Sequence, residues 1–167
     1  MKTYWKILCI ASLAALAPLP CGADDNLLPA LPPQVLAAMR GAAQGAAINC
    51  GHFYDCARQL QVRNPEMGQS LAAILRLRDA AMKYRDAISW NNKPRLDWLR
   101  MCSETLLDAW VNVELSLPQL EPTPPVVDWW DRSQLSLVDL YRAASPYIGQ
   151  PIAPLPSALG VRVTETR

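Results

Sequence analysis

The sequence predicts an all-α protein, a small helical bundle built around a long antiparallel helical hairpin at about residues 65–117, with a proline-rich C-terminal extension. Two successive segments carry apolar residues at alternating steps of three and four, which is the pattern of a helix with one buried face. The first segment shows it at Leu71, Ile74, Leu77, Ala81, Tyr84 and Ile88, and the second at Leu96, Leu99, Ser103, Leu106, Trp110, Val113 and Leu117. Between them Asn91–Pro94 predicts a turn, because asparagine favours turns and helix ends and proline suits a first helical turn.

Residues 1–23 have the features of a secretory signal peptide. A basic start precedes an apolar stretch from Ile7 to Ala17, and small residues at Cys21–Ala23 precede the expected cleavage site. The apolar stretch is too short for an ordinary membrane-spanning helix. Lipidation of Cys21 is the alternative, and Pro20 argues against it because a small residue is normal at that position. The mature protein is therefore expected to be periplasmic or secreted.

The mature chain divides into a helical domain at 24–117 and a part at 118–167 that holds a proline-rich connector, a short helix and an irregular tail. Because Lys2 and Lys6 leave with the signal, the mature chain is nearly neutral, which gives no support for binding nucleic acid or an anionic membrane surface. No later stretch is apolar for long enough to cross a bilayer. Glycine-rich phosphate loops, nucleophile elbows and haem-attachment motifs are absent, so we expect no cofactor and assign no catalytic residue.

A first helix is expected from Pro33 to about Asn49 and is ended by Gly51, with a shorter helix over His52–Arg63 before the hairpin. Gly41 and Gly45 are four residues apart and so lie on one face of the first helix. Two interpretations stay open. The small residues let this helix pack closely against the hairpin, or their face forms a homodimer.

After the hairpin, the connector leads to a helix expected over Gln134–Ala144, and the chain is expected to be irregular from Pro146 onward. Four tryptophans stand beside the hairpin turn and after the connector: Trp90, Trp98, Trp129 and Trp130. Exposed aromatic rings give large contact area at low entropy cost, so all four are candidates for binding a partner. The alternative is structural: the first two form a small satellite core, and the last two cap the hairpin.

Three cysteines remain in the mature chain: Cys50, Cys56 and Cys102. In an oxidising compartment two of them are expected to form a disulfide, and Cys56 with Cys102 is the preferred pair. The third thiol is either buried or joins two chains. The three thiols and His52, the only histidine, have a spacing that matches no common zinc site, so we expect no metal.

The first long helix is basic on its outer side. Arg76, Arg78 and Arg85, with Arg100 from the second helix, are candidates for binding a phosphate or carboxylate, because guanidinium groups grip such anions in bidentate fashion. The alternative is a solvated face with ordinary ion pairs to neighbouring acidic residues.

The functional prediction is an exported envelope protein of a Gram-negative-type bacterium that binds another protein without catalysis. Inhibitor or immunity proteins, and accessory proteins of a secretion or conjugation machine, fit this description. The alternative is a small helical periplasmic enzyme, or an anionic-ligand-binding protein, with an arginine-lined pocket. Arginines that converge on one cavity favour the alternative, and arginines scattered over the surface favour the first prediction.

Overall fold

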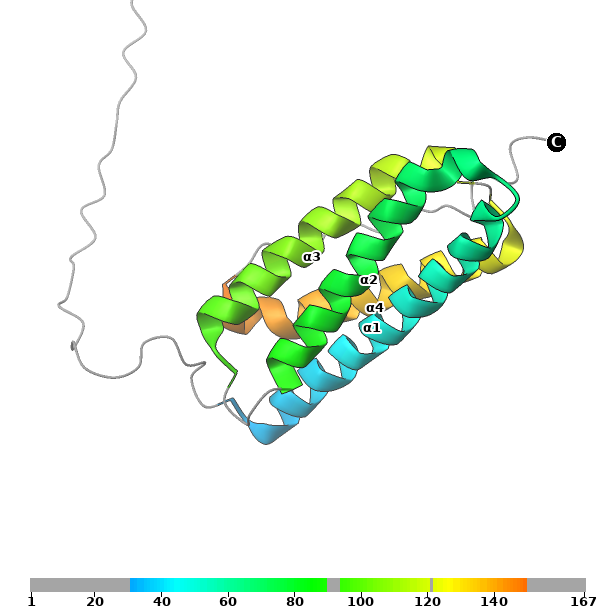
Figure 1. Cartoon of the computed structure of the whole chain (residues 1–167). Coiled ribbons are helices and arrows are strands. Elements are labelled where there is room, and N and C mark those ends of the chain that lie inside the picture. Colours follow the sequence, from blue (N-terminus) through cyan, green and yellow to red (C-terminus); the bar gives the residue numbers. More distant parts are fainter. Residues whose placement is uncertain (1–30, 90–93, 121, 150–167) are drawn as a thin grey trace, which may run out of the picture.

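The computed structural model describes residues 31–89, 94–120 and 122–149, and these residues form four α-helices (Figure 1). The helices are α1 (Pro33–Gln61), α2 (Gly68–Ser89), α3 (Leu96–Ser116) and α4 (Pro124–Ile148), with 3₁₀ turns at Pro65–Met67 and Leu117–Gln119. The described residues contain no strand, which confirms the all-α class. The expected signal peptide with Cys21, the hairpin residue Trp90 and the tail from residue 150 lie outside the described residues.

Each helix of the bundle runs antiparallel to the one before it (Figure 1). α1 packs along both α2 and α4, and α2 packs along α3. One end of the bundle therefore holds the start of α1, the end of α2, the start of α3 and the end of α4. We call this the tip end, and it is marked by Arg40, Ile88, Arg100 and Ile148.

Two arginines join neighbouring helices at the tip end. Arg40 Nε donates to the Ile88 carbonyl (3.2 Å), and Arg100 Nε donates to the Ile148 carbonyl (2.8 Å). A cation at this place satisfies a carbonyl of the last helical turn and complements the helix dipole. Both pairs are separated by 48 residues. The α1–α2 pair of helices and the α3–α4 pair therefore align residue by residue, with Arg40 corresponding to Arg100 and Ile88 to Ile148. Buried positions correspond in the same way: Met39 with Leu99, Ala46 with Leu106, Cys50 with Trp110, Phe53 with Val113, and Leu77 with Leu137.

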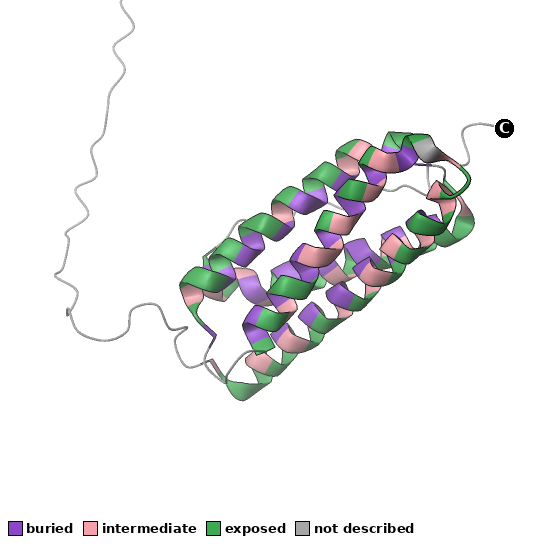
Figure 2. Ribbon diagram, viewed as in Figure 1, coloured by how far each residue is buried: buried purple, intermediate pink, exposed green. Residues whose placement is uncertain are grey.

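The expected break at Gly51 is wrong, because α1 is one continuous helix. The buried face of its first part continues without interruption through Cys50, Phe53 and Ala57 (Figure 2). Glycine inside a helix is less favourable than alanine by about 1 kcal/mol. Burial of one phenylalanine contributes more than that, so packing against the neighbouring helices overrides the local preference of Gly51.

The expected helix over Gln134–Ala144 is too short, because α4 begins at Pro124 and ends at Ile148. A proline at the first helical position loses no intrahelical hydrogen bond, so Pro124 starts the helix where the connector was expected to continue. Pro146 lies inside the last turn and is exposed. Gly149 then ends the helix in the left-handed conformation (φ 68°), and its N–H donates to the Ser145 carbonyl (3.1 Å).

The bundle is tight around α1 and wider between α3 and α4. The residues of α1 that face its neighbours include four buried alanines: Ala43, Ala46, Ala47 and Ala57. Small side chains allow two helix backbones to approach closely. Between α3 and α4, by contrast, the Trp110 and Tyr141 rings face each other (centroids 6.2 Å apart), and the Tyr141 hydroxyl donates to the Ser103 carbonyl (2.8 Å). Large aromatic side chains thus hold α3 away from α4.

Candidate protein-contact site

An open depression lies on the first turns of α3, at the tip end of the bundle. It has a volume of about 510 Å³ and is lined by Arg95, Asp97, Trp98 and Met101; we call these four residues the tip surface. Trp98 is 40% exposed and Met101 is 56% exposed. A tryptophan and a methionine that remain this open in the folded chain offer apolar area suited to contact with another molecule.

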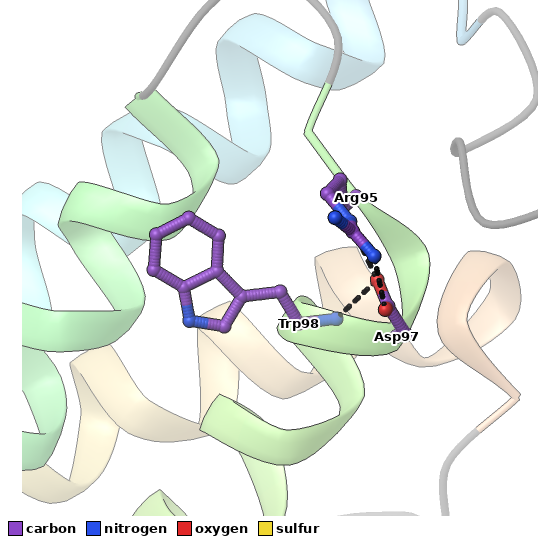
Figure 3. A network of polar contacts seen from close by, with 3 residues as sticks. All are labelled: Arg95, Asp97 and Trp98. Atoms are coloured by element: carbon purple, nitrogen blue, oxygen red, sulfur yellow. Dashed lines mark hydrogen bonds and ion pairs between the residues drawn. The ribbon is translucent and has the colours of Figure 1, made fainter.

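A polar pair forms one side of the tip surface (Figure 3). Arg95 binds both Asp97 carboxylate oxygens, from Nη2 to Oδ2 (2.7 Å) and from Nε to Oδ1 (3.2 Å). The Trp98 backbone N–H donates to Asp97 Oδ1 (2.8 Å), and a carboxylate in the first turn also complements the helix dipole. The Arg95 guanidinium lowers the pKa of the Asp97 carboxyl below its usual range, and the backbone N–H of Trp98 acts in the same direction. The indole of Trp98 extends away from this pair (Figure 3), so the tip surface has one charged side and one apolar side.

Because the α1–α2 and α3–α4 pairs align residue by residue, the surroundings of Trp98 and Met101 on α3 can be compared with the corresponding positions of α1. The positions of α1 that correspond to them are Ala38 and Gly41, and both are exposed. A Cβ built on Gly41 would meet nothing within 4 Å. At these two positions α1 therefore carries almost no side chain. Large, partly exposed apolar side chains at these two positions are therefore particular to α3.

The outer face of α3 continues the apolar character away from the tip end. Val111 is 41% exposed and Leu115 is 73% exposed. Polar residues lie between them and the tip surface, so the apolar positions are separate and do not form one large patch. None of the described helices is both long and apolar enough to cross a membrane.

The two consecutive tryptophans of α4 have different surroundings. Trp130 is fully buried and its ring packs against Phe53 (centroids 5.2 Å apart), so the prediction that it binds a partner is wrong for this fold. Consecutive helical residues point about 100° apart, and Trp129 is accordingly half-buried at the surface of α1 and α4. It stacks on His52 (4.4 Å) and lies under the Arg132 guanidinium (4.8 Å). Trp129 therefore stays a candidate contact residue, but intramolecular stacking already covers part of its ring.

The expected disulfide between Cys56 and Cys102 is not formed, and all three described cysteines are free thiols. Cys56 is on α1 and Cys102 on α3, two helices that occupy opposite corners of the bundle. Cys50 and Cys56 are both on α1, on different sides of it, because six residues correspond to about one and two-thirds turns. Among the described residues, no three of the histidine, cysteine, aspartate and glutamate side chains are grouped as metal ligands.

The four candidate arginines do not converge on one cavity. Arg78 pairs with Asp79 (2.7 Å) and lies over the Tyr54 ring (4.5 Å), whereas Arg85 pairs with Asp86 (2.7 Å). Arg100 binds the Ile148 carbonyl at the tip end, and Arg76 is exposed on the outer side of α2. An anion would therefore meet these side chains one at a time, and two of them, Arg78 and Arg85, are already paired with a neighbouring aspartate.

Of the residues that form the tip surface, the sequence reasoning identified only Trp98. Arg95, Asp97 and Met101 were missed. Only Met101 had a signal in the sequence, because it follows Trp98 by three residues on a side of the helix away from the buried face. None of the protein families, characterised proteins or solved structures compared with the chain matches it.

Proposed function

We propose that this chain is an exported envelope protein that binds another protein without catalysis, and that the tip surface is the place of contact. The observation that carries the proposal is the exposure of Trp98 and Met101, at positions where the corresponding residues of α1 are Ala38 and Gly41. Burial of their exposed apolar surface by a partner would be favourable, and tryptophan is enriched among the residues that contribute most to binding.

The charged side of the tip surface supports the same proposal. Contact sites in proteins combine an apolar centre with a polar rim, and aromatic residues, methionine and arginine are enriched in them. Trp98 and Met101 supply the centre, and the Arg95–Asp97 pair lies beside it. An inhibitor or immunity protein, or an accessory of a secretion or conjugation machine, would act through such a site.

The alternative of an anion-binding pocket receives no comparable support, because Arg76, Arg78, Arg85 and Arg100 have separate surroundings. The export signal lies outside the described residues, and its support is the residue pattern of the sequence alone. Fractionation of the native host and mass measurement of the N-terminal peptide test it: we expect a chain that begins at Asp24 outside the cytoplasm. A chain retained in the cytoplasm with Met1 in place would contradict export.

Affinity capture from the periplasm of the native host tests the binding proposal. The mature protein should retain one partner that a Trp98→Ala, Met101→Ala variant loses. Leu135→Ala is the matched control, because Leu135 on α4 is 62% exposed and its replacement should leave capture unchanged. Equal capture by all three proteins, or none by any of them, would contradict the assignment of the tip surface.

A further inference from the structure

The outer face of α3 carries a regular pattern that begins in the tip surface. Residues at alternating steps of three and four share one side of a helix. On the exposed side of α3 these steps lead through the following residues, which we call the outer stripe: Met101, Glu104, Asp108, Val111 and Leu115. Each of these residues is exposed, and the stripe runs about 21 Å along the helix, at about 1.5 Å per residue.

The two carboxylates of the outer stripe form no ion pair with any residue that the structure describes. Arg100, one turn before Glu104, donates from Nε to the Ile148 carbonyl of α4 (2.8 Å). The other exposed carboxylates of α2, α3 and α4 each pair with a nearby arginine, and they are Asp86, Asp97, Asp128 and Asp139. Glu104 and Asp108 are therefore set apart by the lack of a neutralising cation within ion-pair distance.

The rest of α3 adds no positive charge. Residues 101–120 include three acidic side chains and no lysine or arginine. The third acid, Glu114, is half-buried and accepts a hydrogen bond from Trp110 Nε1 (3.1 Å). The outer stripe is thus negatively charged in its middle and apolar at both ends. At the aligned positions of α1, Gln44 and Ile48 stand in place of the two carboxylates, so this pattern is particular to α3.

We infer that the tip surface and the outer stripe together bind a helix of the partner protein whose contact face is basic and amphipathic. The inference rests on the proposed function, because it gives the chemistry of the partner at the same site. Two lysine or arginine side chains one turn apart on the partner match Glu104 and Asp108, which are also one turn apart. Apolar side chains before and after these cations then cover Met101 and Leu115. A partner helix of about four turns spans the stripe.

Both the spacing and the charge of the stripe support this partner. Two helices pack side by side through side chains that repeat at steps of three and four, and amphipathic helices are recognised through apolar anchors at this spacing. Carboxylates that are unpaired in the free protein gain charge-assisted hydrogen bonds from cations of the partner. An acidic partner would instead place like charges against Glu104 and Asp108, which is unfavourable.

Fluorescence anisotropy of labelled synthetic peptides tests the inference on the mature full-length chain. The first probe is a helical peptide of about 15 residues with leucines at steps of three and four and lysines in the middle of the same face. The second probe has glutamate in place of each lysine. We expect the lysine peptide to bind about tenfold more tightly than the glutamate peptide. The affinity of the lysine peptide should also fall as the salt concentration rises.

Charge-matched variants of the protein locate the binding. Glu104→Gln with Asp108→Asn should weaken binding of the lysine peptide about fivefold, as expected for the loss of two exposed ion contacts. The matched control, Asp86→Asn with Asp139→Asn, removes the same net charge from α2 and α4 and should leave the affinity unchanged. The inference is overturned if the two peptides bind alike, or if the two double variants bind the lysine peptide alike.

A second pair of variants tests the apolar end of the stripe. Leu115→Ser should weaken binding of the lysine peptide, whereas Leu135→Ser, at an exposed leucine of α4, should not. Equal effects of the two substitutions would contradict binding along α3. Light scattering of the protein alone tests a second copy as the occupant: a dimer that the Glu104→Gln, Asp108→Asn variant fails to form would overturn the inference in favour of self-association.

Failure of this inference can be told apart from failure of the proposed function. If the Trp98→Ala, Met101→Ala variant loses the native partner but Glu104→Gln with Asp108→Asn retains it, the tip surface is the contact site and the basic helix is wrong. If the Trp98→Ala, Met101→Ala variant still captures the partner, the contact site itself is wrong, whatever the peptides do.

Discussion

Gly51 distinguishes a broken first helix from a continuous one, and replacement by alanine gives opposite results in the two cases. In the structure Gly51 lies inside α1, and a Cβ at this position would meet nothing within 4 Å. Alanine therefore fits without strain, and it restricts the unfolded chain more than glycine does. We expect Gly51→Ala to raise the free energy of unfolding by about 1 kcal/mol.

The assay is urea unfolding followed by circular dichroism. A gain of about 1 kcal/mol raises the midpoint of thermal unfolding by about 3 °C in a domain of this size. Gly41→Ala should add about as much again, because Gly41 is also helical, free of neighbours and about 15 Å from Gly51 along the axis. Gly149→Ala is the control of opposite sign, with a loss of about 1 kcal/mol, since Gly149 has a φ of 68°.

A loss of stability in Gly51→Ala would refute the reasoning. It would mean that Gly51 adopts a conformation that alanine cannot, as the sequence pattern alone suggested. The m-value of the urea transition checks the comparison, because an unchanged m-value shows that both proteins expose the same amount of surface on unfolding.

Three further predictions concern the core. A thiol-reactive dye should label Cys56 in the native protein, and Cys50 and Cys102 only after unfolding, because both are buried; a peptide map with a disulfide would contradict this. Trp130→Ala should lower the free energy of unfolding by about 3–5 kcal/mol, since it empties a fully buried site. Trp129 is half-buried, so Trp129→Ala should lower it by only about 1–2 kcal/mol. Equal losses in urea unfolding would contradict the different burial of the two side chains. Burial raises the pKa of the Cys50 thiol from 9.0 to about 12, so the thiol ionises more readily in the unfolded chain. Stability measured by urea unfolding should therefore fall as the pH rises above about 9, and it should fall less steeply in Cys50→Ala.

The helices of the predicted hairpin were accessible from sequence because their buried faces are marked by large residues. Leu77 belongs to the apolar repeat of α2, Leu106 and Trp110 belong to that of α3, and all three are fully buried. The full length of α1 and α4 was not accessible, because a glycine inside a helix and a proline at its first position both resemble the signals that end a helix. Gly51 stays helical since Phe53 continues the buried face, and Pro124 begins a helix where it was taken for part of a connector.

The candidate site was predicted only in its most distinctive residue. Trp98 is recognisable by its size, whereas the roles of Asp97 and Arg95 depend on where α3 begins and on the side-chain geometry of its first turn. The cysteine pairing failed for a related reason. Cys56 and Cys102 both lie near apolar stripes, but the decision between neighbouring and opposite helices depends on the order of the helices round the bundle.

Corresponding helices of the α1–α2 and α3–α4 pairs differ in how closely they pack and in which side chains they expose. α1 lies between α2 and α4, and its small residues allow both contacts; at Gly45 a Cβ would lie 3.9 Å from Ser136 Oγ of α4. α3 has the same register but stands away from α4, held there by the Trp110 and Tyr141 rings. A helix that packs closely on one neighbour leaves more of its surface open, and α3 carries Trp98 and Met101 on that surface. The α1–α2 pair therefore contributes closely packed small residues to the bundle, and the α3–α4 pair combines a wider aromatic contact with exposed apolar side chains at the tip end.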